Sequence, residues 1–269
     1  MIRGMGLRGA LSVNVITMIG IGPLITIPLV LAKLHGSLAL WGWLVGALVA
    51  LCDGLIWAEL GSLYPDSGGT YAFLREAFGA ERWGRLFAFL FAWQIVFAAP
   101  MVLASGYIGF AQYAGYLWAP LAGTWWLQGL VGAIVGLVTI ALLYRPIGRI
   151  AATGLGLALV SVGALLAVIV AASPHFSLHQ AVALDPHVPA SAMLYAGLGG
   201  ALVITLYDYY GYGAAATVGD EIREPVRVLP FATIGAILIV AVLYVLLQIA
   251  VLGAIPWSAL GSCRWIDCH

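Results

Sequence analysis

Three carboxylates lie within long apolar stretches of the sequence, at Asp53, Glu59 and Asp208. An ionisable side chain inside a membrane is costly, and it commonly handles a substrate, an ion or a proton. Each of the three could instead be a buried structural group that other side chains satisfy by hydrogen bonds. We favour the structural interpretation for Glu59, which lies near the end of its stretch. Both interpretations stay open for Asp53.

Asp208 differs from the other two because tyrosines and glycines surround it. Gly211 and Gly213 interrupt its apolar stretch, and hydrocarbon would leave the tyrosine hydroxyls there unpaired. Residues 20–28, "GIGPLITIP", interrupt an earlier stretch, since glycine adds flexibility and proline removes a backbone donor. We interpret both interruptions as facing a cavity. The tyrosines are Tyr207, Tyr209, Tyr210 and Tyr212.

The composition places these residues in a membrane protein. Of the 269 residues, 63% are hydrophobic and 8% are charged, and the mean hydropathy is +1.06. A helix of about 20 apolar residues crosses a bilayer. Seven segments meet this criterion, so we predict an all-α, polytopic membrane protein with a single transmembrane domain over residues 1–269. The segments are about residues 10–32, 38–63, 83–113, 126–143, 150–172, 191–218 and 229–254.

The basic residues predict the orientation in the membrane. If the N-terminus is cytoplasmic, every Lys and Arg except Lys33 and Arg264 falls on the cytoplasmic side. The positive-inside rule favours this arrangement. We therefore expect a multi-pass protein of the cell membrane, plasma or inner, with a cytoplasmic N-terminus. The formal net charge of zero argues against a nucleic-acid partner.

The first and sixth segments carry similar interruptions. Transporters commonly contain inverted repeats whose corresponding helices are broken near the membrane midplane. These two segments are the first members of two such repeats if each repeat holds five helices. A broken helix exposes N–H groups that attract a carboxylate and carbonyl groups that attract an ammonium or another cation. Such a site suits a zwitterion.

Three motifs resemble the amino acid–polyamine–organocation superfamily of permeases. They are "MIGIGPL" at residues 18–24, "WAELGSLYPDSGGTYAFLREAFG" at 57–79 and "YYGYGAAATVGDEIREPVRVLPFA" at 209–232. The resemblance implies a LeuT-type fold of two inverted five-helix repeats, with helices 1 and 6 broken at the midplane. The fold would be truncated after helix 7, and residues 190–269 would form an incomplete second repeat. We therefore expect the chain to be incomplete and inactive on its own.

The resemblance also implies a function. It implies a secondary active transporter of amino acids or related amines that works by alternating access. The loop in helix 1 would bind the substrate carboxylate, the interrupted part of helix 6 would bind the amine, and helix 3 would face the cavity. The residues expected to bind the substrate are Gly20, Ile21, Gly22, Pro23, Ser105, Tyr207, Asp208, Tyr209, Tyr210 and Gly211.

Charged residues at the predicted cytoplasmic ends are candidates for an inner gate. In this hypothesis the loop after helix 6 pairs with Glu59 and with Arg75 or Arg85. The alternative is a solvated run of charges, since exposed ion pairs contribute only about 0–1 kcal/mol. The loop residues are Glu221, Arg223 and Arg227.

The predicted partners are an amino acid or amine substrate, the lipid bilayer and a coupling ion, either a proton or sodium. No motif predicts a cofactor, a metal site or an enzyme active site. The alternative to a transporter is a non-transporting seven-helix receptor or assembly subunit. The two are distinguished by whether the interruptions of helices 1 and 6 face one another across a cavity.

Overall fold

The computed structural model describes residues 4–20, 22–79, 81–144, 147–184 and 190–256. These residues form helices and loops, and the strand-like pairing among them is one isolated bridge between Met5 and Ile222. Apolar runs favour helices because a helix satisfies its own backbone in hydrocarbon. The α-helices are α1 (Leu7–Met18), α2 (Gly22–Lys33), α3 (Ala39–Leu63), α4 (Thr70–Ala77), α5 (Trp83–Leu117), α6 (Ala119–Ala122), α7 (Trp125–Leu143), α8 (Ile147–Ala172), α9 (Leu178–Ala181), α10 (Ala190–Tyr209) and α11 (Pro225–Ala254). The 3-10 helices are η1 (Gly36–Leu38), η2 (Ser173–His175) and η3 (Ala214–Glu221).

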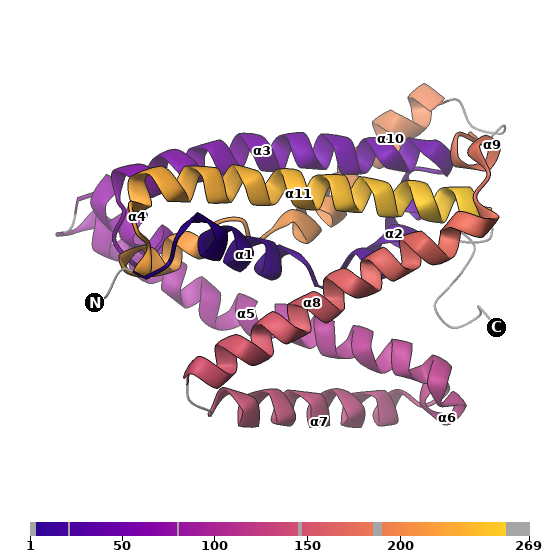
Figure 1. Cartoon of the computed structure of the whole chain (residues 1–269), viewed down its shortest axis with the longest axis horizontal. Coiled ribbons are helices and arrows are strands. Elements are labelled where there is room, and N and C mark those ends of the chain that lie inside the picture. The colour runs from indigo at the N-terminus through magenta and orange to yellow at the C-terminus, as the bar shows by residue number, and fades with distance from the viewer. Residues whose placement is uncertain (1–3, 21, 80, 145–146, 185–189, 257–269) are drawn as a thin grey trace.

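The helices α3 and α11 lie side by side along their length, in the upper part of the view in Figure 1. The helix α1 packs on α11, while α10 packs on α3 and α2. At the core, the ring centroid of Trp43 in α3 lies 6.1 Å from that of Tyr209 and 5.4 Å from that of Tyr244. This aromatic cluster joins α3, α10 and α11, the helices that position the candidate site.

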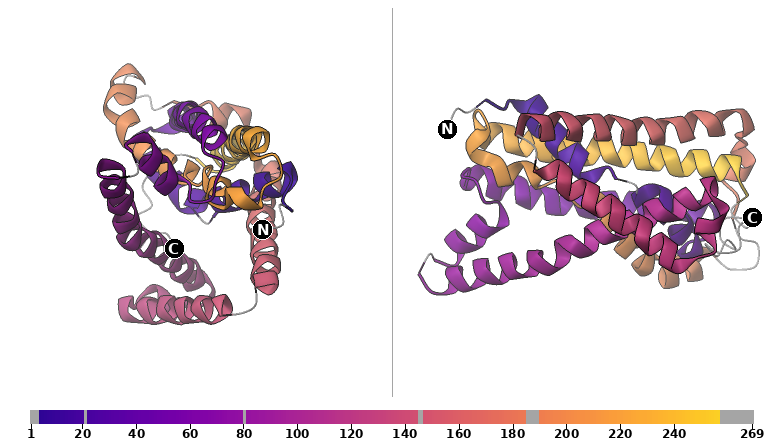
Figure 2. Two further views of the ribbon diagram at one scale, coloured as in Figure 1. Left: turned by 90° about the vertical axis from the view of Figure 1, so that its left-hand side faces the viewer. Right: turned by 90° about the horizontal axis from the view of Figure 1, so that it is seen from below.

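The helices α5 and α7 extend away from this bundle (Figure 2). The helix α7 packs along α5, and α8 packs on α11 and crosses diagonally in front of α5 in Figure 1. Large apolar side chains are exposed on both outer helices, such as Trp93 and Phe97 on α5 and Leu137 on α7. A broad exposed apolar surface suits contact with lipid.

Four helices of the described part are long and apolar enough to cross a membrane. They are Gly36–Leu63, Trp83–Leu117, Trp125–Leu142 and Pro225–Ala254, and α1 with α2 makes a fifth if this bent pair is one span. The structure therefore fits the polytopic, all-helical membrane protein that the composition predicted. The seven-segment count, the single transmembrane domain, the truncated LeuT-type arrangement and the cytoplasmic N-terminus stay predictions.

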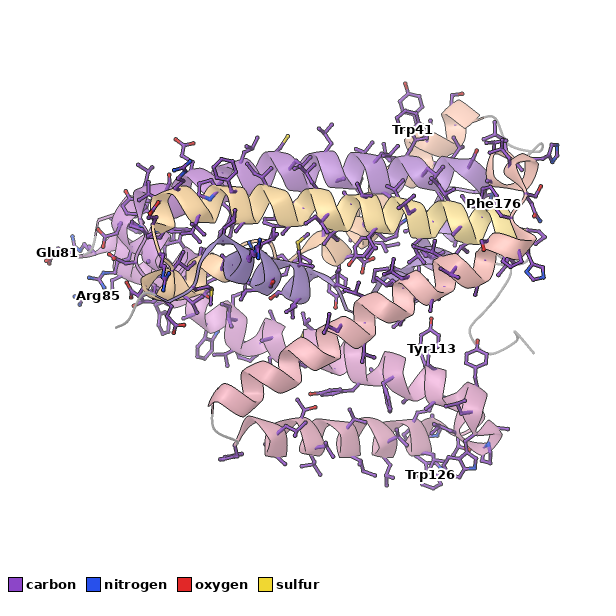
Figure 3. The ribbon with its side chains drawn as sticks, in the orientation of Figure 1. Trp41, Glu81, Arg85, Tyr113, Trp126 and Phe176 are labelled. Carbon is purple, nitrogen blue, oxygen red and sulfur yellow. The ribbon has the colours of Figure 1, made fainter. Side chains whose placement is uncertain are left out.

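Trp43→Ala should destabilise the bundle, because Trp43 is fully buried and its indole N–H donates to Gln248 Oε1 at 2.9 Å. We expect a loss of about 3–5 kcal/mol. The measurement is the temperature at which detergent-solubilised protein leaves the monodisperse peak in size-exclusion chromatography. Trp41→Ala is the matched control, since Trp41 is 52% exposed and points away from the bundle (Figure 3). Equal losses in the two variants would contradict this packing.

Candidate functional site

The first break in the helices separates α1 from α2. The helix α1 ends at Met18, and α2 begins at Gly22 with an axis bent by 51° from that of α1. The last carbonyls of a helix lack partners within it. Here the Tyr244 hydroxyl of α11 donates to the Met18 carbonyl at 2.9 Å. Of the residues expected to bind a carboxylate, Gly20 is exposed, Gly22 is half-buried, Pro23 is buried and Ile21 lies outside the described residues.

The second break follows α10, which ends at Tyr209. Gly211 has a φ of 125°, a conformation that favours glycine, and η3 begins at Ala214. A Cβ on Gly211 would lie 2.9 Å from the Thr17 carbonyl carbon and 3.1 Å from the Met18 nitrogen. The second break therefore packs directly on the end of α1. The two breaks face one another.

Asn14 of α1 holds the segment that follows the second break. Its side chain is fully buried, and its Oδ1 accepts the backbone N–H of Ala215 at 2.7 Å. This N–H is one of the donors that the start of a helix leaves unpaired. Further along, the Met5 nitrogen donates to the Glu221 carbonyl at 2.9 Å, and the Arg223 nitrogen donates to the Met5 carbonyl at 2.8 Å. These bonds join η3 to α1 and to the residues before it.

Asp208 lies where the two breaks meet. Its carboxyl group is buried, and a Cβ on Gly22 would collide with its Oδ1. The Thr26 hydroxyl of α2 donates a hydrogen bond to Asp208 Oδ2 at 2.5 Å. The same hydroxyl lies 3.0 Å from the Gly22 carbonyl oxygen. Asp208 Oδ1 has no hydrogen-bond partner among the described residues. The start of α2, which carries the positive end of the helix dipole, thus adjoins a carboxylate with one free oxygen.

The tyrosines of the second break point in different directions. Tyr209 is fully buried, and its hydroxyl donates to the Trp43 carbonyl at 3.3 Å. The Tyr207 hydroxyl lies 3.0 Å from Ser105 Oγ, so these two exposed residues link α10 to α5. Tyr210 is 70% exposed. The structure thus brings Ser105 and Tyr207 together and directs the Tyr209 side chain into the core.

A cavity of about 600 Å³ adjoins the second break. Thr17 and Gly211, which form the contact between the two breaks, both line it. The helix α3 contributes Asp53 and Trp57 to the wall. Asp53 Oδ2 accepts a hydrogen bond from the Tyr212 hydroxyl. Among the described residues that line the cavity, Asp53 is the one carboxylate, and it lies beside the second break.

The six candidate gate residues are all exposed: Glu59, Arg75, Arg85, Glu221, Arg223 and Arg227. The structure places Arg75 Nε 3.9 Å from Glu76 Oε1, the neighbouring residue in the chain, and both side chains are about half exposed. A pair of this kind contributes only about 0–1 kcal/mol. Arg85 projects from the surface at the same end of the molecule as Glu81 (Figure 3). The gate stays a prediction.

Sequence reasoning missed Asn14, Thr26 and Tyr244. Asn14 did offer a signal, because an amide within an apolar segment needs hydrogen-bond partners when it is buried. Thr26 and Tyr244 offered none, since both residue types are common in membrane helices. Their roles depend on which helices lie side by side.

Comparison with known proteins shows what kind of protein carries this site. The model of the amino acid permease family matches residues 7–266. The chain belongs to this family. The resemblance to the amino acid–polyamine–organocation superfamily of permeases is thereby confirmed, and the named relatives are transporters rather than enzymes.

Named relatives of this chain are transporters. It is 33% identical over 258 residues to the serine/threonine exchanger SteT of Bacillus subtilis (strain 168), a match that covers 93% of this chain and 55% of SteT. It is 26% identical over 241 residues to the glutamate/serine transporter AimA of the same strain, covering 83% of this chain and 42% of AimA. The inner membrane transport protein YbaT of Escherichia coli (strain K12) is 24% identical over 266 residues, covering 98% of this chain and 59% of YbaT. The chain spans about half the length of these curated relatives.

Gly211→Ala should separate the two breaks, because the added methyl group meets backbone atoms of Thr17 and Met18 that cannot move aside like a flexible side chain. The positive φ at this position adds strain for any residue with a side chain. From the collision and the strain together, we expect the free energy of unfolding to fall by about 1–3 kcal/mol. The measurement is again thermal stability in detergent. Gly199→Ala on α10 is the control, since a Cβ there meets nothing within 4 Å. If Gly211→Ala is as stable as its control, the breaks do not pack as described.

Proposed function

We propose that the permease is a secondary active transporter of amino acids or related amines that binds its substrate between the two breaks and works by alternating access. A zwitterion needs hydrogen-bond donors for its carboxylate and acceptors for its ammonium. The start of α2 offers donors and a positive dipole end, whereas the end of α10 offers carbonyls and a negative dipole end. Because the breaks touch, both sets of groups lie within reach of one small molecule.

One observation carries this proposal: the buried Asp208 carboxylate has one oxygen without a donor among the described residues, at the point where the breaks meet. A buried polar atom that lacks its partner costs about 1–3 kcal/mol. The ammonium group of a substrate would satisfy Oδ1, while Thr26 keeps its bond to Oδ2. Asp208 is therefore assigned to the amine.

The substrate carboxylate is assigned to the Gly20 side of the first break. Asp208 adjoins Gly22, and two carboxylates on the same spot would repel one another. Gly20 is exposed and bears no side chain that would shield its backbone from a ligand. The amine would then lie between Asp208 and the last carbonyls of α10, with Tyr207 and Ser105 at the edge of the site.

The remaining parts of the mechanism follow the sequence-based expectations. The six exposed candidate gate residues would form the cytoplasmic gate. Transport of the substrate would be coupled to movement of a proton or a sodium ion. The names of SteT and AimA both include serine, which makes L-serine the first probe. Binding is the appropriate measurement, because the chain spans about half the length of these relatives.

Asp208→Asn should weaken L-serine binding by about tenfold or more, because the amide cannot make a charge-assisted hydrogen bond with the ammonium. It still offers an oxygen to Thr26, so the packing of α2 on α10 is retained. The measurement is the Kd of radiolabelled L-serine for the 269-residue chain in lipid nanodiscs, with L-threonine and L-glutamate as further probes.

The matched control is Asp66→Asn, the same chemical change at an exposed residue in the loop after α3. It should leave the Kd unchanged. An unaltered Kd in Asp208→Asn would remove Asp208 from the site. If neither these three amino acids nor any cationic amino acid binds to the wild-type chain, the proposed function is wrong.

A further inference from the structure

Asp53 is a second carboxylate beside the breaks, and the proposed function does not use it. It lies on α3 and lines the cavity of about 600 Å³ next to the second break. Most of the larger side chains that line this cavity are aromatic. These aromatic lining residues are Trp57, Tyr71, Phe91, Tyr210 and Tyr212.

The Asp53 carboxylate is held in place, and the described residues that line the cavity supply no counter-charge. The Tyr212 hydroxyl donates to its Oδ2, whereas its Oδ1 receives no hydrogen bond in the part of the chain that the structure describes. None of the described residues that line the cavity is a lysine, an arginine or a histidine. A negative charge in surroundings of low dielectric constant attracts a cation strongly.

The aromatic wall indicates which cation would bind. An ammonium group gains energy over the face of a Trp, Tyr or Phe ring. A metal ion would instead need several oxygen, nitrogen or sulfur ligands. The described residues contain no group of three or more His, Cys, Asp or Glu side chains that could supply them. One carboxylate among aromatic rings therefore fits an organic ammonium.

The cavity reaches the contact between the two breaks. Thr17 and Gly211 form the contact between the breaks and also line the cavity. Tyr212, which holds Asp53, directly follows Gly211. A substrate whose α-amino and carboxylate groups lie at the breaks would thus extend its side chain toward Asp53.

We propose that Asp53 and its aromatic neighbours bind the side-chain ammonium of a diamino acid, so that the permease prefers cationic to neutral or acidic substrates. This inference rests on the proposed function, because it places the backbone groups of the substrate at the breaks. It assigns different ends of one substrate to two carboxylates: Asp208 takes the α-amino group and Asp53 takes the side-chain ammonium.

The test compares L-ornithine with L-norvaline, a neutral amino acid of similar length that lacks the second ammonium. Both affinities are measured on the 269-residue chain in lipid nanodiscs. The wild-type chain should bind L-ornithine about 10- to 100-fold more tightly, as expected for a charge-assisted hydrogen bond. Asp53→Asn should bring the ratio of the two affinities close to one.

Two further variants separate charge from structure. Asp53→Glu and Tyr212→Phe both keep the carboxylate, so both should retain a preference for L-ornithine. Asp66→Asn removes an exposed carboxylate and should leave the ratio as in the wild type. If Asp53→Asn does not fold, the ratio of the two affinities in the wild type, in Asp53→Glu and in Tyr212→Phe still tests the role of Asp53.

The outcomes distinguish this inference from the proposed function. Asp208→Asn should weaken both ligands together, because both carry the α-amino group. A wild-type ratio near one, with both ligands bound, would overturn the role of Asp53 and leave the proposed function standing. A ratio that persists in Asp53→Asn would also overturn it. Failure of both ligands and of L-serine to bind would overturn the two proposals together.

Discussion

Backbone groups that a helix break frees inside hydrocarbon must find partners, and this constraint shapes the fold of this chain. At each break, a residue distant in the sequence satisfies one of the freed backbone groups. The Met18 carbonyl at the end of α1 accepts from Tyr244 of α11, and the Ala215 N–H after the second break donates to Asn14 of α1. The breaks are therefore stable only while α1, α10 and α11 stay packed together.

The same constraint places charge at the junction. Asp208 lies against Gly22 at the start of α2, where the helix dipole favours a negative group, and Thr26 holds one of its oxygens. The groups that stabilise the broken helices are thus the kinds of groups that a zwitterion would bind. Asp53, on the wall of the adjoining cavity, adds a second carboxylate beside the second break, where it accepts a hydrogen bond from the Tyr212 hydroxyl.

The sequence predicted the class of fold and the family well, because both depend on local patterns. Long apolar runs predicted an all-helical membrane protein, and the motifs around residues 18–24, 57–79 and 209–232 predicted the family. The contacts of the site could not be predicted. Whether Asp208 meets Thr26, or the Tyr209 side chain enters the core, depends on the rotation of α10 against α2 and α3. Composition and spacing along one chain do not contain that information.

The central claim is that both breaks form one substrate site. Hydrogen–deuterium exchange of the 269-residue chain in nanodiscs tests it most directly, with whichever of L-serine, L-glutamate and L-ornithine binds best. On adding a saturating ligand, the account predicts slower exchange in peptides covering residues 17–24 and in those covering residues 207–215, at the same ligand concentration. Protection of only one of these segments, or protection confined to other helices, would contradict it.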